Sequence, residues 1–228
     1  MTTPNSKALI FLLTVTSFLT GPAWAEGTTR TDEINTCLPG ELQTWDDHQD
    51  VRPSHSVFAF DYRHSPRSIF SEKEVTERIE RSLQAWRECG LSLSLRQPSL
   101  SSPAPTSHKI QIDWDAQAAR IGIAVADLNR RRLSLNPTVF ELLIERRDHR
   151  IALETLQMTL SHEIGHFFGM LAHSRRCVDV MSYYDDGKGA QCMIRDRAEF
   201  RKVPEYRSSL PTACDIKRCQ ILQQTKEK

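Results

Sequence analysis

Two stripes, one apolar and one largely polar, run along residues 151–167. Side chains of each kind recur there with the period of an α-helix. The apolar stripe consists of Ile151, Leu153, Leu156, Leu160, Ile164 and Phe167, and the polar stripe of Thr155, Thr159, His162 and His166. The pattern predicts a helix that buries one side in the core and holds two histidines on another side.

The alternation of apolar and polar residues predicts several strands before that helix. Alternation with a period of two is typical of a strand that is buried on one face. It occurs over residues 57–62, 91–96, 109–114 and 132–136. The last of these strands is expected just before the histidine-bearing helix.

Local signals predict two more helices and two loops. Ser71 and Glu74 have the spacing of a capping box, which starts a helix that runs to about Cys89. A closing helix is expected over residues 211–223, with Thr212 near its start. The Ser- and Pro-rich residues 98–107 and the turn-rich residues 185–189 are predicted loops.

The segment SHEIGHFFGMLAHS holds the strongest candidate chemistry. His162 and His166 are four residues apart, so both rings lie on one face of a helix and can point at one metal ion. Catalytic zinc usually takes three protein ligands and one water, and His173 is the candidate for the third. On a continued helix His173 would lie about 10 Å beyond His166, too far to share the ion. Gly169 resolves this, because a left-handed glycine can end the helix and turn the chain back.

Glu163 is the candidate general acid and base. It lies about 100° around the helix from His162, so it should flank the metal ion instead of binding it. A carboxylate in that position can take a proton from a metal-bound water as the water attacks a carbonyl, and return it to the leaving amine. The predicted reaction is amide hydrolysis.

The sequence HEIGHFFGMLAH, followed by CVDVMSYY, resembles the HExxHxxGxxH helix and the Met-turn of the metzincin zinc metallopeptidases. The resemblance implies one catalytic zinc ion with His162, His166 and His173 as ligands. It also implies that Met181 is the Met-turn methionine, an apolar floor beneath the metal, and that Tyr183 can approach the zinc and stabilise the transition state.

The chain departs from the family pattern at the third histidine. The usual position holds Ala172, and His173 comes one residue later, so the loop is longer by one residue. A surface turn absorbs such an insertion at small entropic cost, and His173 remains the expected ligand. Asp179, Asp185 and Asp186 are the alternative ligands.

The resemblance also implies a fold. It is an α+β fold, a metzincin-like single domain with a twisted mixed β-sheet, two long helices, a zinc cleft and a small, mostly irregular C-terminal subdomain with a closing helix. Substrate would lie antiparallel to an edge strand, for which residues 120–125 are the candidate. The zinc metallopeptidase domain is expected over residues 53–228.

Three functions compete. The leading one is a secreted zinc endopeptidase, and the others are a catalytically inactive zinc-containing binding protein of the same fold and a zinc amidase acting on non-protein or cell-wall peptide substrates. Each residue also has a plainer interpretation: the histidine pair as a structural or surface feature, Met181 as core filler, and Tyr183 as a packed aromatic. The remaining histidines lack ligand spacing and are interpreted as ordinary surface or loop residues: His48, His55, His64, His108 and His149.

The N-terminus predicts export. Lys7, an apolar run over residues 8–19 and the sequence Ala23-Trp24-Ala25 have the layout of a secretory signal peptide, assigned to residues 1–25. The protein is therefore expected to be secreted or periplasmic, without stable membrane insertion after cleavage. Residues 26–52 form an N-terminal segment that is either a propeptide or a disulfide-tied extension.

Six cysteines in an exported chain favour disulfides. Cys177 and Cys192 bracket the Met-turn and are expected to pair, whereas Cys214 and Cys219 point to different faces of the closing helix and should each bond elsewhere. Cys37 has an alternative, because its thiolate could occupy the open zinc position and keep a protease latent.

Charge gives no sign of a polyanionic partner. The chain has 30 basic and 29 acidic residues. Loss of the signal peptide would remove one charged residue, Lys7. A protein or peptide substrate is expected, with no nucleic acid and a monomeric state. Calcium is a further option that no motif supports, although Asp185 and Asp186 offer oxygen ligands.

Overall fold

The computed structural model describes residues 29–66, 68–96, 109–119 and 122–224. The predicted signal peptide and the predicted loop over residues 98–107 lie outside these ranges. The elements run in the order α1 (Thr29–Asn35), β1 (Val57–Tyr62), α2 (Glu72–Trp86) with a 3₁₀ turn η1 (Arg87–Cys89), β2 (Ser92–Arg96), β3 (Lys109–Trp114), β4 (Ala124–Asp127), β5 (Arg132–Leu135), α3 (Pro137–Arg146), α4 (His149–Phe167), α5 (Arg197–Phe200) and α6 (Ala213–Gln224).

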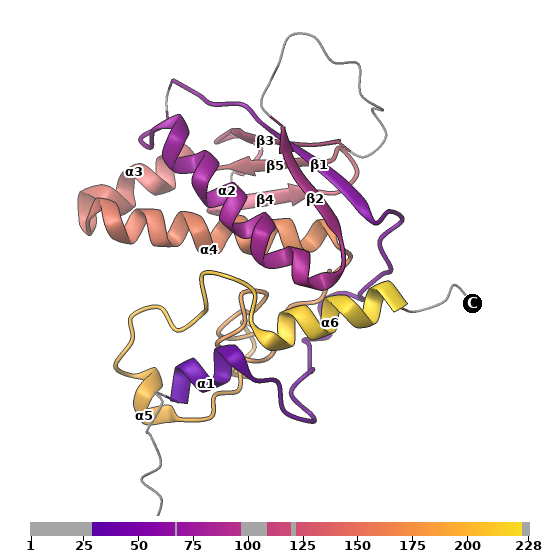
Figure 1. The fold of residues 1–228 in the computed structure, drawn as a ribbon. Helices are drawn as coiled ribbons and strands as arrows, with labels where there is room; N and C mark the ends of the chain where they lie inside the picture. Colours follow the sequence, from indigo (N-terminus) through magenta and orange to yellow (C-terminus); the bar gives the residue numbers. More distant parts are fainter. Residues whose placement is uncertain (1–28, 67, 97–108, 120–121, 225–228) are drawn as a thin grey trace, which may run out of the picture.

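A five-stranded mixed sheet in the order β2-β1-β3-β5-β4 forms one half of the molecule (Figure 1). Strands β2, β1, β3 and β5 are parallel, and β4 pairs antiparallel with β5. The connection between the parallel neighbours β1 and β2 passes through α2, as parallel pairing requires a long crossover. The expected α+β fold with a mixed sheet is confirmed, and β4 is an edge strand.

The main core lies between the sheet and the two long helices. Figure 1 shows α2 crossing in front of the sheet and α4 running along the side of β4. The capping box of Ser71 and Glu74 is present at the start of α2. Fully buried side chains come from the strands (Phe60, Ile112, Leu133, Leu135), from α2 (Val75, Ile79, Trp86) and from α4 (Leu156, Leu160, Ile164). The apolar stripe of α4 therefore faces the core as predicted.

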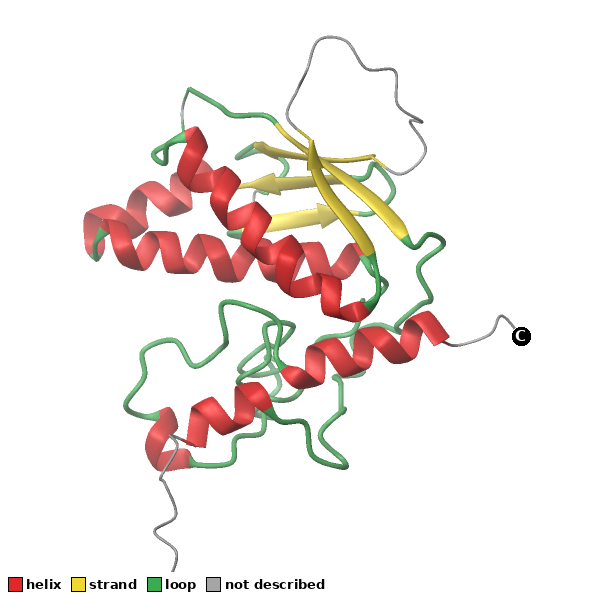
Figure 2. Cartoon of the chain, viewed as in Figure 1, coloured by secondary structure: helices red, strands yellow, loops and turns green. Residues whose placement is uncertain are grey.

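The other half of the molecule is mostly irregular (Figure 2). It contains the loops that follow α4 and the short helices α1 and α5, and α6 closes it along the end of α2 (Figure 1). A small second core forms around Cys177, Val178 and Tyr206. The expectation of an irregular C-terminal part with a closing helix is confirmed.

Three disulfides are present, and two of them link distant segments. Cys177 bonds Cys192 as predicted, and α6 is tied through Cys214 to Cys37 and through Cys219 to Cys89. The expectation that Cys214 and Cys219 bond elsewhere is confirmed. The latency interpretation of Cys37 is wrong, because its sulfur is bonded to Cys214.

The bounds of two expected strands need correction. The edge strand expected at residues 120–125 is β4, which begins at Ala124 and continues to Asp127. The strand expected over residues 132–136 ends at Leu135, because the side chain of Asn136 accepts a hydrogen bond from the Thr138 amide and caps α3. Helix α3 was not predicted, although an asparagine followed by proline is a known helix start.

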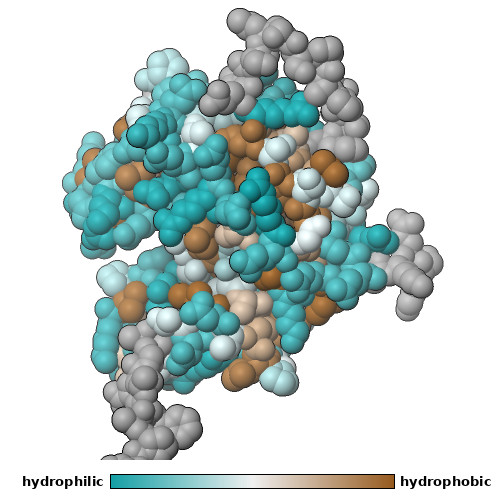
Figure 3. Space-filling view, in the orientation of Figure 1, coloured by the Kyte–Doolittle hydropathy of each residue, from teal (hydrophilic) through white to brown (hydrophobic). Residues whose placement is uncertain are grey.

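The face of the molecule drawn in Figure 3 is largely polar. In the view of Figure 3, hydrophilic residues cover much of the visible face, and apolar residues gather mainly near its middle. Among the described residues, none of the helices combines the length and apolar character needed to cross a membrane.

Candidate metal centre

Two histidines on the last turns of α4 have fixed ring orientations. The Nδ1 atom of His162 lies 2.7 Å from the carbonyl oxygen of Val180, and that of His166 lies 2.8 Å from the carbonyl oxygen of Met170. A carbonyl oxygen can only accept, so each Nδ1 carries the hydrogen and each Nε2 keeps a free lone pair. The two rings are thus oriented as metal ligands are, with the other nitrogen held by a neighbour.

His173 reaches the same point because the chain turns back after α4. Gly169 has a φ of 88°, the left-handed conformation expected of it. His173 is 4% exposed, and its Nε2 lies 3.2 Å from the Nε2 of His162. Candidate ligand atoms of His162, His166 and His173 lie within 4.8 Å of one another. The structure therefore brings together the three histidines that the sequence singled out, including the shifted third one.

The three rings favour the neutral form that a metal ligand needs. Burial lowers the pKa of His162 well below its usual value, and the neighbouring His166 and His173 lower it further. Burial also lowers the pKa of His166, to about 4. The pKa of His173 is lowered by burial, against an opposing hydrogen bond from Asp47. Three neutral imidazoles with converging Nε2 atoms fit zinc.

Glu163 lies beside the histidines on α4 and next to the edge strand. Burial raises the pKa of its carboxyl to about 7, and a hydrogen bond with the backbone of Ala126 in β4 opposes that rise. A carboxyl with this pKa can both accept and return a proton near neutral pH. Its flanking of the metal position stays a prediction from its place on the helix.

Met181 packs against α4 at Gly165, a position between the two histidines in the sequence. Its side chain is fully buried, and a Cβ atom added to Gly165 would lie 2.5 Å from its sulfur. Met181 is also bonded to the residue that follows His173, since the amide of Ser174 donates to the carbonyl of Met181. Glycine at position 165 thus allows the methionine to approach the helix closely.

Tyr183 stacks on the third histidine. The ring centroids of Tyr183 and His173 are 3.6 Å apart at an interplanar angle of 21°, and the tyrosine is 41% exposed. Burial raises the pKa of its hydroxyl to about 12, with Asp47 and Glu163 contributing in the same direction. The hydroxyl is therefore protonated at neutral pH and able to donate a hydrogen bond.

The alternative ligands do not join the three histidines. Asp179 is buried among Arg176, Ser174 and Thr212, to which its carboxylate is hydrogen-bonded. Asp185 and Asp186 accept hydrogen bonds from the amides of their own turn. These contacts provide hydrogen-bond partners for all three carboxylates within the protein.

Two of the other histidines make structural hydrogen bonds. His64 bonds the hydroxyl of Tyr62, and His149 bonds Glu74. His48 is exposed, with its ring centroid 6.5 Å from that of His173. His55 is half-buried, and His108 lies outside the described residues.

The side-chain contact that holds His173, made by the carboxylate of Asp47, was not predicted from the sequence. One oxygen lies 3.1 Å from the backbone nitrogen of His173, and the other lies 2.6 Å from its Nδ1. Partial burial acts to raise the pKa of Asp47, but the hydrogen bonds to His173 outweigh it and the pKa is lowered. Because the two residues are 126 positions apart, no local spacing could have indicated the contact.

Comparisons with known proteins do not assign a function to this chain, so the function is inferred from the site. No family model matches the chain, and no curated protein matches it. A solved structure described as the GM1 bound form of the ECX AB5 holotoxin is similar over 74% of this chain and 80% of that chain, with 11% identity and a TM-score of 0.46.

Proposed function

We propose that this protein is a zinc endopeptidase with His162, His166 and His173 as its metal ligands. The observation that carries the proposal is the arrangement of the three rings. Each Nδ1 is held by an acceptor, and the remaining nitrogens converge on the face of α4 that is flanked by the half-buried Glu163. Three protein ligands leave one position for water, as in catalytic zinc sites.

Glu163 is the proposed acid and base. Bound zinc would supply a Lewis acid that lowers the pKa of water and polarises a carbonyl. Glu163 accepts the proton of the attacking water and then delivers it to the leaving amine. A bound cation would lower the pKa of this carboxyl and so favour the carboxylate form that accepts the proton.

The edge strand β4 supports an extended peptide as the substrate. It pairs with β5 on one side only, and it packs against α4, where the backbone of Ala126 lowers the pKa of Glu163. A peptide added along the open side of β4 would form main-chain hydrogen bonds and lie next to the acid and base. This is the substrate placement that the resemblance to metzincins implies.

Two further roles follow from that resemblance. Met181 is the proposed apolar floor of the site, which agrees with its complete burial against α4. Tyr183 is the proposed hydrogen-bond donor to the oxyanion of the transition state, and its protonated hydroxyl and partial exposure support that role.

The setting of the protein is also proposed. Its three disulfides agree with an exported chain, secreted or periplasmic. We propose a monomer that acts on proteins or peptides and binds no nucleic acid.

Zinc content and casein cleavage, measured together, test the proposal. The wild type should hold one zinc ion and cleave casein. Glu163→Gln should hold zinc while its rate falls by about 10²- to 10⁴-fold, the usual contribution of general acid and base catalysis. His173→Ala should lose zinc and activity, whereas Asp186→Asn, which alters an exposed turn near the site, should change neither.

Other outcomes would favour the alternatives. Tight zinc binding without cleavage of casein or of a peptide panel would favour a binding protein of this fold. Cleavage confined to cell-wall peptides would favour a zinc amidase. Full zinc retention and activity in His173→Ala would show that the third ligand lies elsewhere.

A further inference from the structure

Residues 45–51, here called the strap, run along residues 169–173, here called the ligand loop. The amide of Val51 donates to the carbonyl of Gly169 at 2.9 Å, and the amide of Trp45 donates to the carbonyl of His173 at 2.8 Å. Between these two bonds, the side chain of Asp50 accepts from the amide of Ala172 at 3.0 Å. The ligand loop is therefore bonded to the strap at both ends and near its middle.

Asp47, in the middle of the strap, makes two bonds to one residue. Its oxygens accept from the backbone amide and from the Nδ1–H of His173, at 3.1 Å and 2.6 Å. The first bond positions the backbone of the ligand loop, and the second sets the tautomer and the angle of the ring. A carboxylate behind a histidine ligand also raises the basicity of the nitrogen that faces the metal.

The strap is anchored to the closing helix beside the ligand loop. Arg218 of α6 bonds the carboxylate of Asp50, with its Nε 2.6 Å from one oxygen, and also donates to the carbonyl of Ala172. One arginine therefore joins the strap to the residue that precedes His173. Arg218 is itself buried, which limits the freedom of all three segments.

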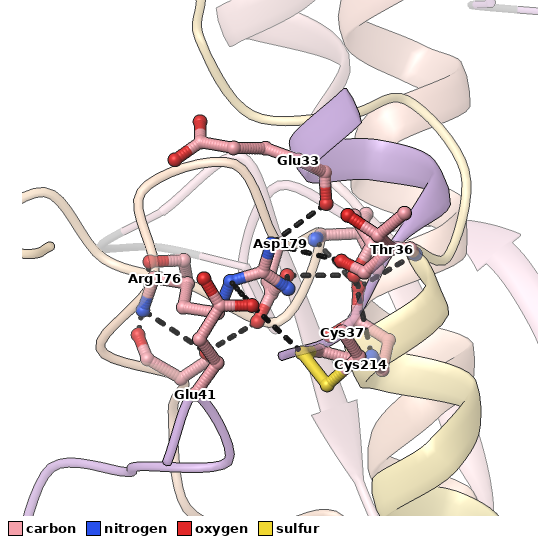
Figure 4. Close-up of polar contacts among 12 residues, drawn as sticks. Glu33, Thr36, Cys37, Glu41, Arg176, Asp179 and Cys214 are labelled. Carbon is pink, nitrogen blue, oxygen red and sulfur yellow. Dashed lines mark hydrogen bonds and ion pairs between the residues drawn. A yellow bond between two sulfur atoms is a disulfide. The ribbon is translucent and has the colours of Figure 1, made fainter. Parts of the chain in front are cut away.

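The chain before the strap is bonded to the segment around Arg176 and Asp179, in the mostly irregular half of the molecule (Figure 4). Arg176 is buried, and it pairs with Asp179 at 2.9 Å and with Glu41 at 3.6 Å while donating to the carbonyl of Glu33 at 2.6 Å. The disulfide of Cys37 with Cys214 lies in the same cluster (Figure 4). Residues 33–51 are thus held at several points along their length.

We propose that Asp47 is a positioning residue for the third metal ligand and that the strap is a lasting part of the metal centre, not a removable propeptide. The inference rests on the proposed zinc site. Its physical basis is the longer ligand loop: one residue more than the family pattern leaves His173 with extra freedom, and the strap removes that freedom through bonds to Gly169, Ala172 and His173.

Zinc affinity of the full chain, measured by competition with a chromophoric chelator, tests this role. Asp47→Ala should weaken zinc binding by about 10- to 100-fold, the usual effect of losing a partner behind a metal ligand. Asp46→Ala is the matched control, because Asp46 is the exposed neighbour in the same strap and makes no described contact with His173. Its zinc affinity should equal that of the wild type.

A spectroscopic measurement separates positioning from general stability. With cobalt in place of zinc, the visible absorption bands report the geometry of the ligands. The bands should shift in Asp47→Ala and stay unchanged in Asp46→Ala. The bands of Asp47→Asn should lie between those of Asp47→Ala and the wild type. An amide has one oxygen that accepts hydrogen bonds, whereas a carboxylate has two.

The outcomes distinguish this inference from the proposed function. If the wild type takes up no zinc, the metal site is wrong and the role of Asp47 is overturned with it. If the wild type binds zinc and Asp47→Ala binds it equally tightly with the same cobalt spectrum, only the positioning role is overturned. If Asp47→Ala no longer folds, weaker zinc binding and a shifted spectrum in folded Asp47→Asn support the role, and unchanged values in that variant overturn it.

Discussion

Gly169 lies directly against the backbone of Val51. The amide of Val51 donates to the carbonyl of Gly169, and a Cβ atom added to the glycine would lie 1.9 Å from the carbonyl oxygen of Val51. The glycine that ends the histidine-bearing helix therefore serves two purposes. It takes the left-handed conformation of the turn, and it leaves room for the strap that holds the third histidine.

Gly169→Ala should destabilise the protein more than an ordinary left-handed glycine would. Gly90 supplies the matched control, because it has a φ of 87° with nothing within 4 Å of an added Cβ, whereas Gly169 has a φ of 88° and a clash. Gly90→Ala should lower the free energy of unfolding by about 1–2 kcal/mol through the backbone conformation alone. Gly169→Ala should lower the free energy of unfolding by at least about twice that amount, because the strap must also move. It should bind zinc more weakly for the same reason. Equal losses in denaturant titrations of the two variants would contradict the close approach.

Tyr183→Phe should reduce turnover without loss of zinc. The phenyl ring keeps the stacking on His173, while the hydroxyl that we propose as oxyanion donor is removed. Loss of one such donor lowers kcat by about 10²- to 10³-fold, with KM and zinc content nearly unchanged.

Tyr184→Phe is the control for that measurement. The hydroxyl of Tyr184 bonds Glu205 and accepts from the amide of Tyr206, so its loss should lower the melting temperature and leave kcat close to the wild-type value. The role of Tyr183 is excluded if steady-state kinetics give the two variants the same kcat.

Glu74 should contribute to the acid sensitivity of the fold. Hydrogen bonds from His149 and Ser71 lower the pKa of its carboxyl to about 2 in the folded state, from an ordinary value of 4.5. Because the folded value is the lower one, its stabilisation is present above about pH 4.5 and is lost as the pH falls toward 2. Glu74→Gln should flatten this part of the stability curve by less than about 1 kcal/mol, since the carboxyl is partly exposed and solvent screens its ion pair with His149.

Thermal unfolding of the metal-free protein between pH 2 and 7 measures this effect. Glu80→Gln, at an exposed position of the same helix, should keep the wild-type pH dependence. The contribution of Glu74 is refuted if the two variants follow the same curve.

Local sequence predicted the elements that depend on near neighbours. The stripes of α4, the capping box at Ser71 and the turn at Gly169 each involve residues within a few positions of one another, and all three are present. Position 136 shows how such signals compete. Alternation favoured a continued strand, but the side chain of Asn136 caps α3, so the strand ends one residue earlier.

The sequence by itself determined which residues form the candidate metal site, because histidine spacing on a helix and a left-handed glycine are properties of a short stretch of chain. Only the tertiary structure decided what holds that site. Val180 orients His162 across 18 positions, and Asp47 orients His173 across 126. Such contacts form when the core, the disulfides and buried ion pairs bring distant segments together, and no periodicity in the sequence records which segments will meet.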